Sequence, residues 1–150
     1  MNEEPTQLLA SVRQFGIQLS ATPRGARLAR LLAVEQLRTW ELDAVADAAA
    51  QIVAELASNA ATHGHVSGRD FQLRMFALPD VLRIEVTDTR ADRLPEMRTP
   101  GDGDGGGESG RGLVLVDALA SRGWGVELGP PPRKTVWAQV ELAPPGRPLA

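Results

Sequence analysis

Residues 43–64 read DAVADAAAQIVAELASNAATHG, and this stretch decides the fold. We expect one long helix that begins after Asp43, a favourable N-cap residue, and ends at Gly64, a favourable C-terminal stop. Apolar residues recur at helical spacing and predict a broad buried stripe; they are Val45, Ala48, Ala49, Ile52, Val53, Leu56 and Ala60.

Three polar residues form a row along one edge of this predicted helix. Glu55 and Asn59 are four residues apart and therefore neighbours on the helix surface, and His63 continues the row one turn later. At ~100° per residue, Asn59 falls at the border of the apolar stripe. A carboxylate and an amide oxygen in this arrangement suit a hard cation and a polarised water. The alternative is a pair of solvated residues on an amphipathic helix, and the pattern taken alone favours that alternative.

The composition limits the class of protein. The chain has 150 residues, 43% of them hydrophobic, which is enough for one domain with one core. Its net charge is −3 and it has no basic block, so we expect no direct nucleic-acid partner. It has no cysteine, which excludes a disulfide framework and a thiolate site. No apolar run approaches the ~20 residues of a membrane span and the N-terminus is no signal peptide, so we expect a cytoplasmic protein without a membrane partner.

Two elements are predicted before the central helix. Phe15, Ile17 and Leu19 alternate with polar or small residues and indicate a short strand. Thr22-Pro23 then opens a helix that runs to about Arg38. We expect its inward side chains to be Ala26, Leu28, Leu31, Leu32 and Leu37, and its outward ones to be Arg24, Arg27, Arg30, Glu35 and Arg38.

A hairpin follows the central helix. Residues 71–78 and 81–88 have strand character and are joined by the turn Pro79-Asp80. The alternation places Asp88 on the same face as the apolar residues Leu82, Ile84 and Val86. A carboxylate buried there would need hydrogen-bond donors around it. The alternative, in which the strand has already ended and Asp88 caps a loop in water, fits this position equally well.

Residues 89–110 predict a loop that is first charged and then glycine-rich. Residues 113–120, LVLVDALA, predict a short buried helix with Ser109 and Gly110 near its start. Free N–H groups at a helix N-terminus, approached through glycines, make a ready anion site, whereas the alternative is a plain flexible linker. The GxGxxG match at 101–106 does not directly follow a strand, and no GxxxxGK[ST] occurs, so neither of these phosphate-binding motifs is present.

Residues 124–128 and 134–142 predict a second hairpin; the apolar face of its last strand carries Val136, Ala138, Val140 and Leu142. The resulting element order predicts an α+β two-layer sandwich, in which helices cover one face of a mixed, mostly antiparallel sheet. We expect residues 14–142 to form this domain, between a flexible N-terminus, 1–13, and a flexible tail, 143–150.

Residues 14–142 resemble the compact Bergerat-type ATP-binding domain of the GHKL superfamily (gyrase, Hsp90, histidine kinase, MutL). Within it they most resemble the anti-sigma-factor serine/threonine kinases and their small actinobacterial relatives. Residues 55–64, ELASNAATHG, resemble the helix box ELxxNAxxHG of this family. The resemblance implies that Asn59 binds Mg²⁺ between the phosphates, that Glu55 acts as a base or orients water, and that His63 belongs to the nucleotide site.

Further motifs carry the same resemblance. Asp88 occupies the position of the Asp that accepts a hydrogen bond from the adenine amino group. Residues 110–120, GRGLVLVDALA, resemble the segment GRGLxLVxALA where lid meets helix, which implies a phosphate-binding role for Gly110, Arg111, Gly112 and Leu113. Thr135 matches a Thr that supports the adenine end through water, although its parity along the strand places it on the face opposite Val136.

Two positions depart from the family pattern. Residues 88–92, DTRAD, lack the glycines of the D-x-G-x-G motif, and Glu108 stands where another glycine would let the backbone approach phosphate. An acidic residue beside a triphosphate would repel it unless the side chain turns outward or Mg²⁺ intervenes. Both departures weigh against assuming activity, not against the fold.

The resemblance implies an ATP-binding regulatory protein similar to an anti-sigma factor. It further implies ATP and Mg²⁺ as cofactors, a sigma factor or an anti-anti-sigma-like antagonist as partner, and a homodimer. An active member would transfer the γ-phosphate to a Ser or Thr of the antagonist, with Glu55 at the acceptor hydroxyl and Arg111 neutralising charge.

The alternative hypothesis is a non-catalytic nucleotide-sensing or protein-interaction module on the same fold. A kinase needs Glu55 and Mg²⁺, whereas a binding module tolerates Glu55→Ala. Two other hypotheses are weaker: a sensor histidine kinase fragment lacks its phosphoacceptor helix in this sequence, and a metal site at His63 and His65 lacks a third ligand at suitable spacing.

Overall fold

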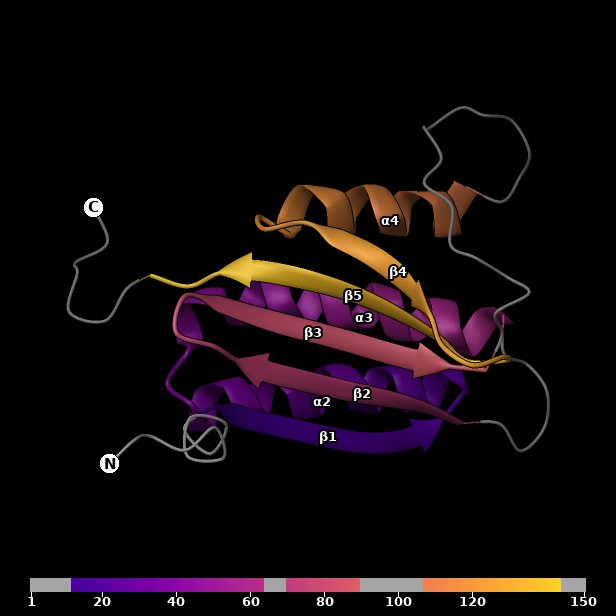
Figure 1. The fold of residues 1–150 in the computed structure, drawn as a ribbon, viewed down its shortest axis with the longest axis horizontal. Helices are drawn as coiled ribbons and strands as arrows, with labels where there is room; N and C mark the ends of the chain where they lie inside the picture. The colour runs from indigo at the N-terminus through magenta and orange to yellow at the C-terminus, as the bar shows by residue number, and fades with distance from the viewer. Residues whose placement is uncertain (1–11, 64–69, 90–106, 144–150) are drawn as a thin grey trace.

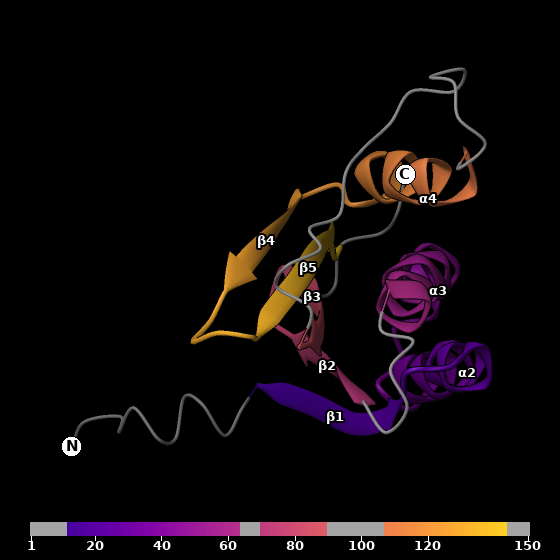
Figure 2. The same ribbon diagram turned by 90° about the vertical axis from the view of Figure 1, so that its right-hand side faces the viewer.

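The computed structural model describes residues 12–63, 70–89 and 107–143. In these residues a five-stranded sheet carries helices on one of its faces (Figure 1). The strand order is β1 (Arg13–Ser20), β2 (Asp70–Ala77), β3 (Val81–Asp88), β5 (Lys134–Glu141) and β4 (Trp124–Leu128). Figure 2 shows α2 (Pro23–Thr39), α3 (Ala46–His63) and α4 (Gly107–Leu119) side by side on the same side of the sheet. The predicted α+β two-layer sandwich is confirmed.

All pairings between the described strands are antiparallel, so the expected mixed character of the sheet is wrong for this part of the chain. Both predicted hairpins are present, β2–β3 across Pro79 and Asp80, and β4–β5. The predicted face of β3 is also confirmed: Leu82, Ile84, Val86 and Asp88 are all buried. The alternative in which the strand ends before Asp88 is therefore wrong.

The predicted start of α2 is confirmed. Thr22 is the N-cap, and its Oγ1 accepts a hydrogen bond from the N–H of Gly25 at 3.0 Å. Pro23 occupies the first turn, where a missing N–H costs nothing. Gly25 is required by packing, because a Cβ at this position would collide with the carbonyl oxygen of Ser20.

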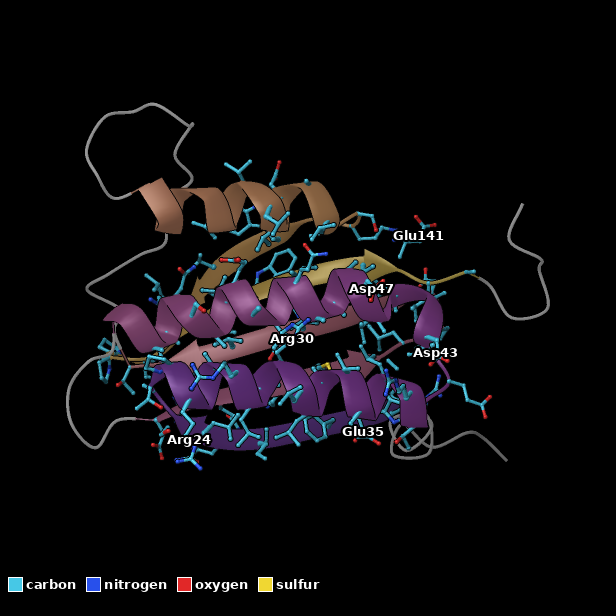
Figure 3. The ribbon with its side chains drawn as sticks, turned by 180° about the vertical axis from the view of Figure 1, so that it is seen from behind. Arg24, Arg30, Glu35, Asp43, Asp47 and Glu141 are labelled. Atoms are coloured by element: carbon cyan, nitrogen blue, oxygen red, sulfur yellow. The ribbon has the colours of Figure 1, made fainter. Side chains whose placement is uncertain are left out.

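The face that α2 buries differs from the predicted one. Leu28 and Leu31 are 43% and 59% exposed, while small residues are buried in their place, namely Gly25, Ala26, Ala29 and Ala33, together with Leu37. α2 packs against both β1 and α3, and alanine lets a helix backbone approach its neighbours closely. The leucines consequently lie on the outer side of the helix. The predicted outward residues are confirmed, and Figure 3 shows Arg24, Arg30 and Glu35 among the exposed charged side chains of this layer.

The central helix starts later than expected. Asp43 lies in a 3₁₀ turn, Asp43–Val45, rather than capping a continuous helix, and α3 begins at Ala46. Gly64, the expected stop, lies outside the described residues. The buried stripe is confirmed at its centre by Ala49, Ile52, Val53, Leu56 and Ala60. α3 thus packs on the sheet with α2 on one flank and α4 on the other (Figure 2).

α4 starts six residues earlier than the predicted helix of residues 113–120. It begins at Gly107, so the last part of the expected loop, residues 107–110, is helical. Glycine disfavours a helix interior by ~1 kcal/mol, but Leu113 and Val116 are fully buried and hold the helix against the core. The remainder of the predicted loop, 90–106, lies outside the described residues, as do the predicted termini beyond residues 12 and 143.

The sheet face opposite the described helices carries an organised cluster around Arg83. The guanidinium lies 4.6 Å from the ring centre of Trp137, and its Nε donates to Glu85 at 2.7 Å. It also donates to Gln139 at 3.2 Å and to Glu127 at 3.4 Å. We call these five residues the outer cluster. It spans β3, β5 and β4 and fastens three strands together from the outside.

Candidate functional site

Four chain segments meet at one end of the molecule. Figure 1 shows the C-terminal ends of α3 and β3 together with the first residues of α4 and β5 at the same end of the long axis. α3 packs against both β3 and β5, and α4 packs against α3. The residues predicted for the nucleotide site come from these four elements. The fold therefore gathers, at one end, segments that are far apart in the sequence.

Glu55 and Asn59 lie on the side of α3 that faces away from α2. Ala54 and Ser58, each one residue earlier, line a groove between α2 and α3. One residue along a helix is a rotation of ~100°, which turns Glu55 and Asn59 away from this groove and toward the edge bordering α4. Both side chains are half-buried. The two side chains thus lie at the rim of the core, one helical turn apart.

Burial raises the pKa of the Glu55 carboxyl above its usual value of 4.5. The cause is desolvation, which disfavours the charged form of an acid. A carboxylate whose pKa is moved toward neutral pH is better suited to accept a proton than a fully solvated one. This geometry and this shift are compatible with the role of base expected for Glu55.

Asp88 is buried at the C-terminal end of β3, where it is 7% exposed. Directly opposite it in the register is Lys134, the first residue of β5, which is 3% exposed. The Lys134 Nζ lies 3.5 Å from the Asp88 Oδ2. A buried carboxylate was expected to need donors around it, and Lys134, the only lysine in the chain, supplies one.

Thr135 lies on the other face of the sheet. Its Oγ1 is 2.7 Å from the Oγ1 of Thr87, the residue opposite it on β3. The structure thus confirms that Thr135 lies on the face opposite Val136. It does not bring Thr135 to the face that carries Asp88. Lys134 occupies that face instead. No role was predicted for Lys134, although it stands on the strand face of Val136 at the strand's first position.

The expected phosphate-binding segment lies inside α4. Because the helix begins at Gly107, the four residues Gly110, Arg111, Gly112 and Leu113 fall in its first two turns. Only the first few N–H groups of a helix lack an intrahelical acceptor. In the described helix these are the groups of residues 107–109, so the amides available to an anion are shifted toward the N-terminus. The side chains of Arg111 and His63 lie outside the described residues.

The polar side chains at this end fit a magnesium nucleotide. Asn59 offers an amide oxygen, a hard ligand that suits Mg²⁺, and Asp88 offers an acceptor in a buried position. Among the described residues, no group of three or more His, Cys, Asp or Glu side chains could hold a metal ion alone. A cation here would therefore take its other ligands from phosphate oxygens and water.

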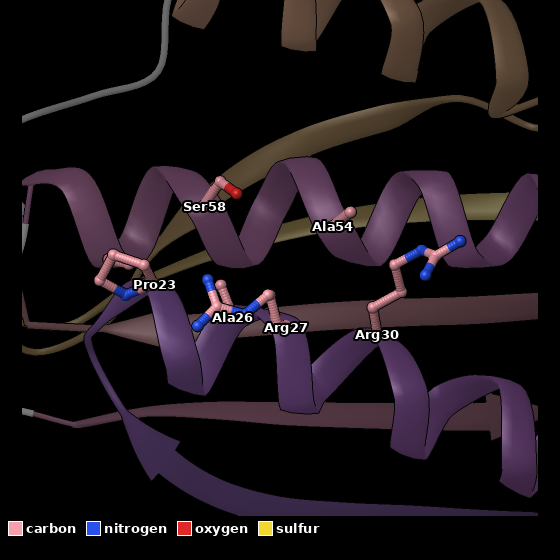
Figure 4. A pocket seen from close by; sticks show the side chains of 7 residues that line it. Pro23, Ala26, Arg27, Arg30, Ala54 and Ser58 are labelled. Atoms are coloured by element: carbon pink, nitrogen blue, oxygen red, sulfur yellow. The ribbon is translucent and has the colours of Figure 1, made fainter.

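A separate groove of ≈ 470 Å³ lies between α2 and α3. It is lined by Pro23, Ala26, Arg27, Arg30, Ala54, Ser58 and Ala61. Figure 4 shows the side chains of Arg27 and Arg30 extending from α2 into the space beside α3, which contributes Ala54 and Ser58 to the groove. This groove is on the α2 side of α3 and is distinct from the edge that carries Glu55 and Asn59.

Comparison with known families gives a match. A family model described as a histidine kinase-like ATPase domain matches residues 19–137, which include Glu55, Asn59, Asp88 and all of α4. No curated protein matches the chain significantly. Within the described ranges, no helix combines the length and hydropathy that crossing a bilayer requires.

Proposed function

The chain belongs to the histidine kinase-like ATPase domain family, and from this premise we propose that it is a cytosolic ATP-binding regulator resembling an anti-sigma factor. The proposal includes the transfer of a phosphoryl group to a Ser or Thr of a protein antagonist. One observation carries it: Glu55 and Asn59 are half-buried one turn apart in the second half of α3, and the C-terminal end of this helix lies at the same end of the molecule as the buried Asp88.

Each residue has a distinct proposed role. Asn59 binds Mg²⁺ through its amide oxygen, and Asp88 accepts a hydrogen bond from the amino group of adenine. Mg²⁺-ATP, when bound, supplies the γ-phosphoryl group that the acceptor hydroxyl takes up with release of ADP. Glu55 receives the proton of that hydroxyl, for which its raised pKa is suited. Free N–H groups in the first turn of α4 offer a site for negative charge.

Titration calorimetry with ATP, in the presence and absence of Mg²⁺, tests the site. We expect Asp88→Asn to weaken ATP binding by about tenfold or more, since a hydrogen bond to a charged acceptor is worth ~1.5–3 kcal/mol. Asn59→Ala should remove most of the Mg²⁺ dependence. Matched controls are Asp80→Asn, in the exposed turn before β3, and Ser58→Ala, on the groove side of α3. Equal affinities for all variants would contradict the proposed site.

A second candidate function is a non-catalytic nucleotide-binding module. It is favoured by one specific observation, the missing glycines after Asp88 in the sequence DTRAD. The two functions differ at Glu55. In a kinase, Glu55→Ala abolishes phosphate transfer while ATP still binds; in a binding module, the same change alters neither nucleotide binding nor the response of the partner.

The proposed protein partner is a sigma factor or its antagonist, and we propose that an acidic, partly apolar segment of it contacts α2. Support comes from the arginines of the groove, Arg27 and Arg30, beside the exposed Leu28 and Leu31. Fluorescence anisotropy with a labelled acidic amphipathic peptide tests this surface. Arg27→Ala should weaken binding more than Arg133→Ala, in an exposed turn. The homodimer stays a prediction, which sedimentation velocity tests.

A further inference from the structure

We propose that Lys134 reads the base of the nucleotide together with Asp88. In this assignment the Asp88 carboxylate accepts from the 6-amino group of adenine, and the Lys134 ammonium donates to the neighbouring ring nitrogen N1. The inference rests on the proposed nucleotide site and adds a residue that decides its specificity.

The position of Lys134 supports this role. Asp88 and Lys134 are paired in the register of β3 and β5, at the strand ends that meet the proposed site. Their side chains are only 8% and 4% exposed, so neither is an ordinary surface charge. The next residue along β5, Thr135, is directed to the opposite face by its contact with Thr87. Lys134 is therefore the β5 side chain that shares a face with Asp88 at this rung of the sheet.

The chemistry of the pair matches one edge of adenine. That edge presents a donor, the 6-amino group, beside an acceptor, N1. A carboxylate is an acceptor and an ammonium is a donor without acceptor capacity. With Nζ and Oδ2 3.5 Å apart, the pair can form two adjacent hydrogen bonds of about 2.9 Å to neighbouring groups of a base. The ammonium has three donors, so one N–H can remain on Asp88 while another serves the base.

The pair also favours adenine over bases that lack this pattern. Inosine and guanine present the reverse pattern, a carbonyl oxygen at position 6 and a hydrogen on N1, so in the same pose an acceptor would face the Asp88 carboxylate and a donor would face the Lys134 ammonium. Discrimination is strong when a site's buried polar groups are left unpaired by the wrong ligand. The side chain at position 134 would thus contribute to selectivity through the base and not through the phosphates.

The test compares ATP with 1-deaza-ATP, in which N1 is replaced by C–H, in binding titrations of the intact protein. We expect the wild type to bind 1-deaza-ATP about tenfold more weakly than ATP. In Lys134→Met this difference should vanish, whereas it should persist in Arg133→Met, which removes a neighbouring exposed cation. Purine riboside triphosphate, which lacks the 6-amino group, should remain a weaker ligand than ATP for Lys134→Met, because Asp88 is still present.

The outcomes separate this inference from the proposed function. ATP binding without any difference between ATP and 1-deaza-ATP in the wild type overturns the role of Lys134 and leaves the nucleotide site standing. That comparison needs no variant, so it holds even if Lys134→Met fails to fold. Tighter ATP binding by Lys134→Met also overturns the inference, since it would mean that Lys134 competes with the base for Asp88. Absence of ATP binding by the wild type overturns both proposals.

Discussion

The two faces of the sheet hold opposite charges in contact, and they do so in different ways. On the outer face, Arg83 shares its guanidinium among Glu85, Gln139 and Glu127 while stacking on Trp137. On the inner face, Asp88 and Lys134 form a pair across the same two strands, β3 and β5. The outer residues keep some contact with solvent, whereas the inner pair is almost fully enclosed.

The difference lies in what happens when one partner is removed. A partly exposed charge returns to water at little cost, so surface ion pairs contribute modestly. A buried charge that loses its partner cannot be solvated by water. Removing one member of a buried pair therefore lowers the free energy of unfolding strongly, even where the intact pair adds little net stability. The outer cluster is therefore suited to fastening strands, and the inner pair to presenting charge in an enclosed site.

The largest expected effect is at the inner pair. Asp88→Ala leaves the Lys134 ammonium buried without its carboxylate and should lower the free energy of unfolding by ~3–5 kcal/mol. Urea denaturation followed by circular dichroism measures this change. Glu127→Ala is the control, because it removes an outer-cluster carboxylate that is 62% exposed, and it should cost less than ~1 kcal/mol. Similar losses in the two variants would contradict the contrast between the faces.

Gly125→Ala tests how tightly the outer cluster is packed. A Cβ at Gly125 would lie 2.8 Å from the Trp137 Cζ2, so the indole must move from its place beneath Arg83. We expect a loss of ~1–3 kcal/mol in thermal and urea unfolding, as for other overpacked positions. Gly16→Ala, where the nearest side-chain atom is 3.5 Å away, should leave stability nearly unchanged. A Gly125 variant as stable as the Gly16 variant would show that the indole is free to shift.

Removing the cation from the outer cluster should have a smaller effect. Arg83→Met takes away the contacts with Glu85 and with the Trp137 ring and should cost ~1 kcal/mol in urea denaturation. The loss should be smaller at high salt, which screens the partly exposed ion pairs. Arg74→Met is the control, since Arg74 is 46% exposed and lies 4.0 Å from Glu85. A loss above ~3 kcal/mol for Arg83→Met would place the outer cluster in the same class as the inner pair.

The smallest expected effect is at Glu55, which forms no ion pair with any residue that the structure describes. Burial raises the pKa of its carboxyl in the folded protein, so folding favours the neutral acid. Stability from this group is therefore present at low pH and is lost as the pH rises from about 4.5 through the raised pKa. Glu55→Gln should stabilise the protein by ~0.5 kcal/mol at pH 7, a small value because the side chain is partly solvated.

The pH dependence distinguishes this effect from a change in packing. The difference in free energy of unfolding between Glu55→Gln and the wild type should shrink toward zero below pH 4.5. Chemical denaturation at several pH values between 4 and 8 measures it. A difference that stays constant over this range would mean that the substitution acts through contacts and not through ionisation.

Local patterns predicted most of the fold because the residues that decide it are close in sequence. Thr22 and Pro23 mark the start of α2, and the alternation of Leu82, Ile84 and Val86 orients β3. The inward face of α2 was predicted wrongly because hydrophobicity favours leucine over alanine as a core residue. In the structure, the close approach of β1 and α3 admits only the smaller side chains, a constraint that no single helix reveals.

The candidate site could be predicted only as far as single elements allow. The row of Glu55 and Asn59 follows from the spacing within one helix. The partner of Asp88 does not, because it depends on how β5 aligns with β3, and forty-odd residues separate Asp88 from Lys134 in the sequence. The start of α4 was missed for a related reason. The low helix propensity of its glycines predicts a loop. In the structure the segment is helical, and Leu113 of this helix is buried.

The order of the strands has a consequence for how the chain folds. β2–β3 and β4–β5 are hairpins of neighbouring segments, whereas β1–β2 and β3–β5 both join strands that are distant in the chain, with α2 and α3 between the first pair and α4 and β4 between the second. Closing long loops is slow, so we expect these two long-range seams to limit the folding rate and the local hairpins to precede them. Asp88 and Lys134 lie on the β3–β5 seam. The proposed base-binding pair therefore forms only when β5 has paired with β3. As a consequence, we expect the chain to bind nucleotide only after this long-range step of folding is complete.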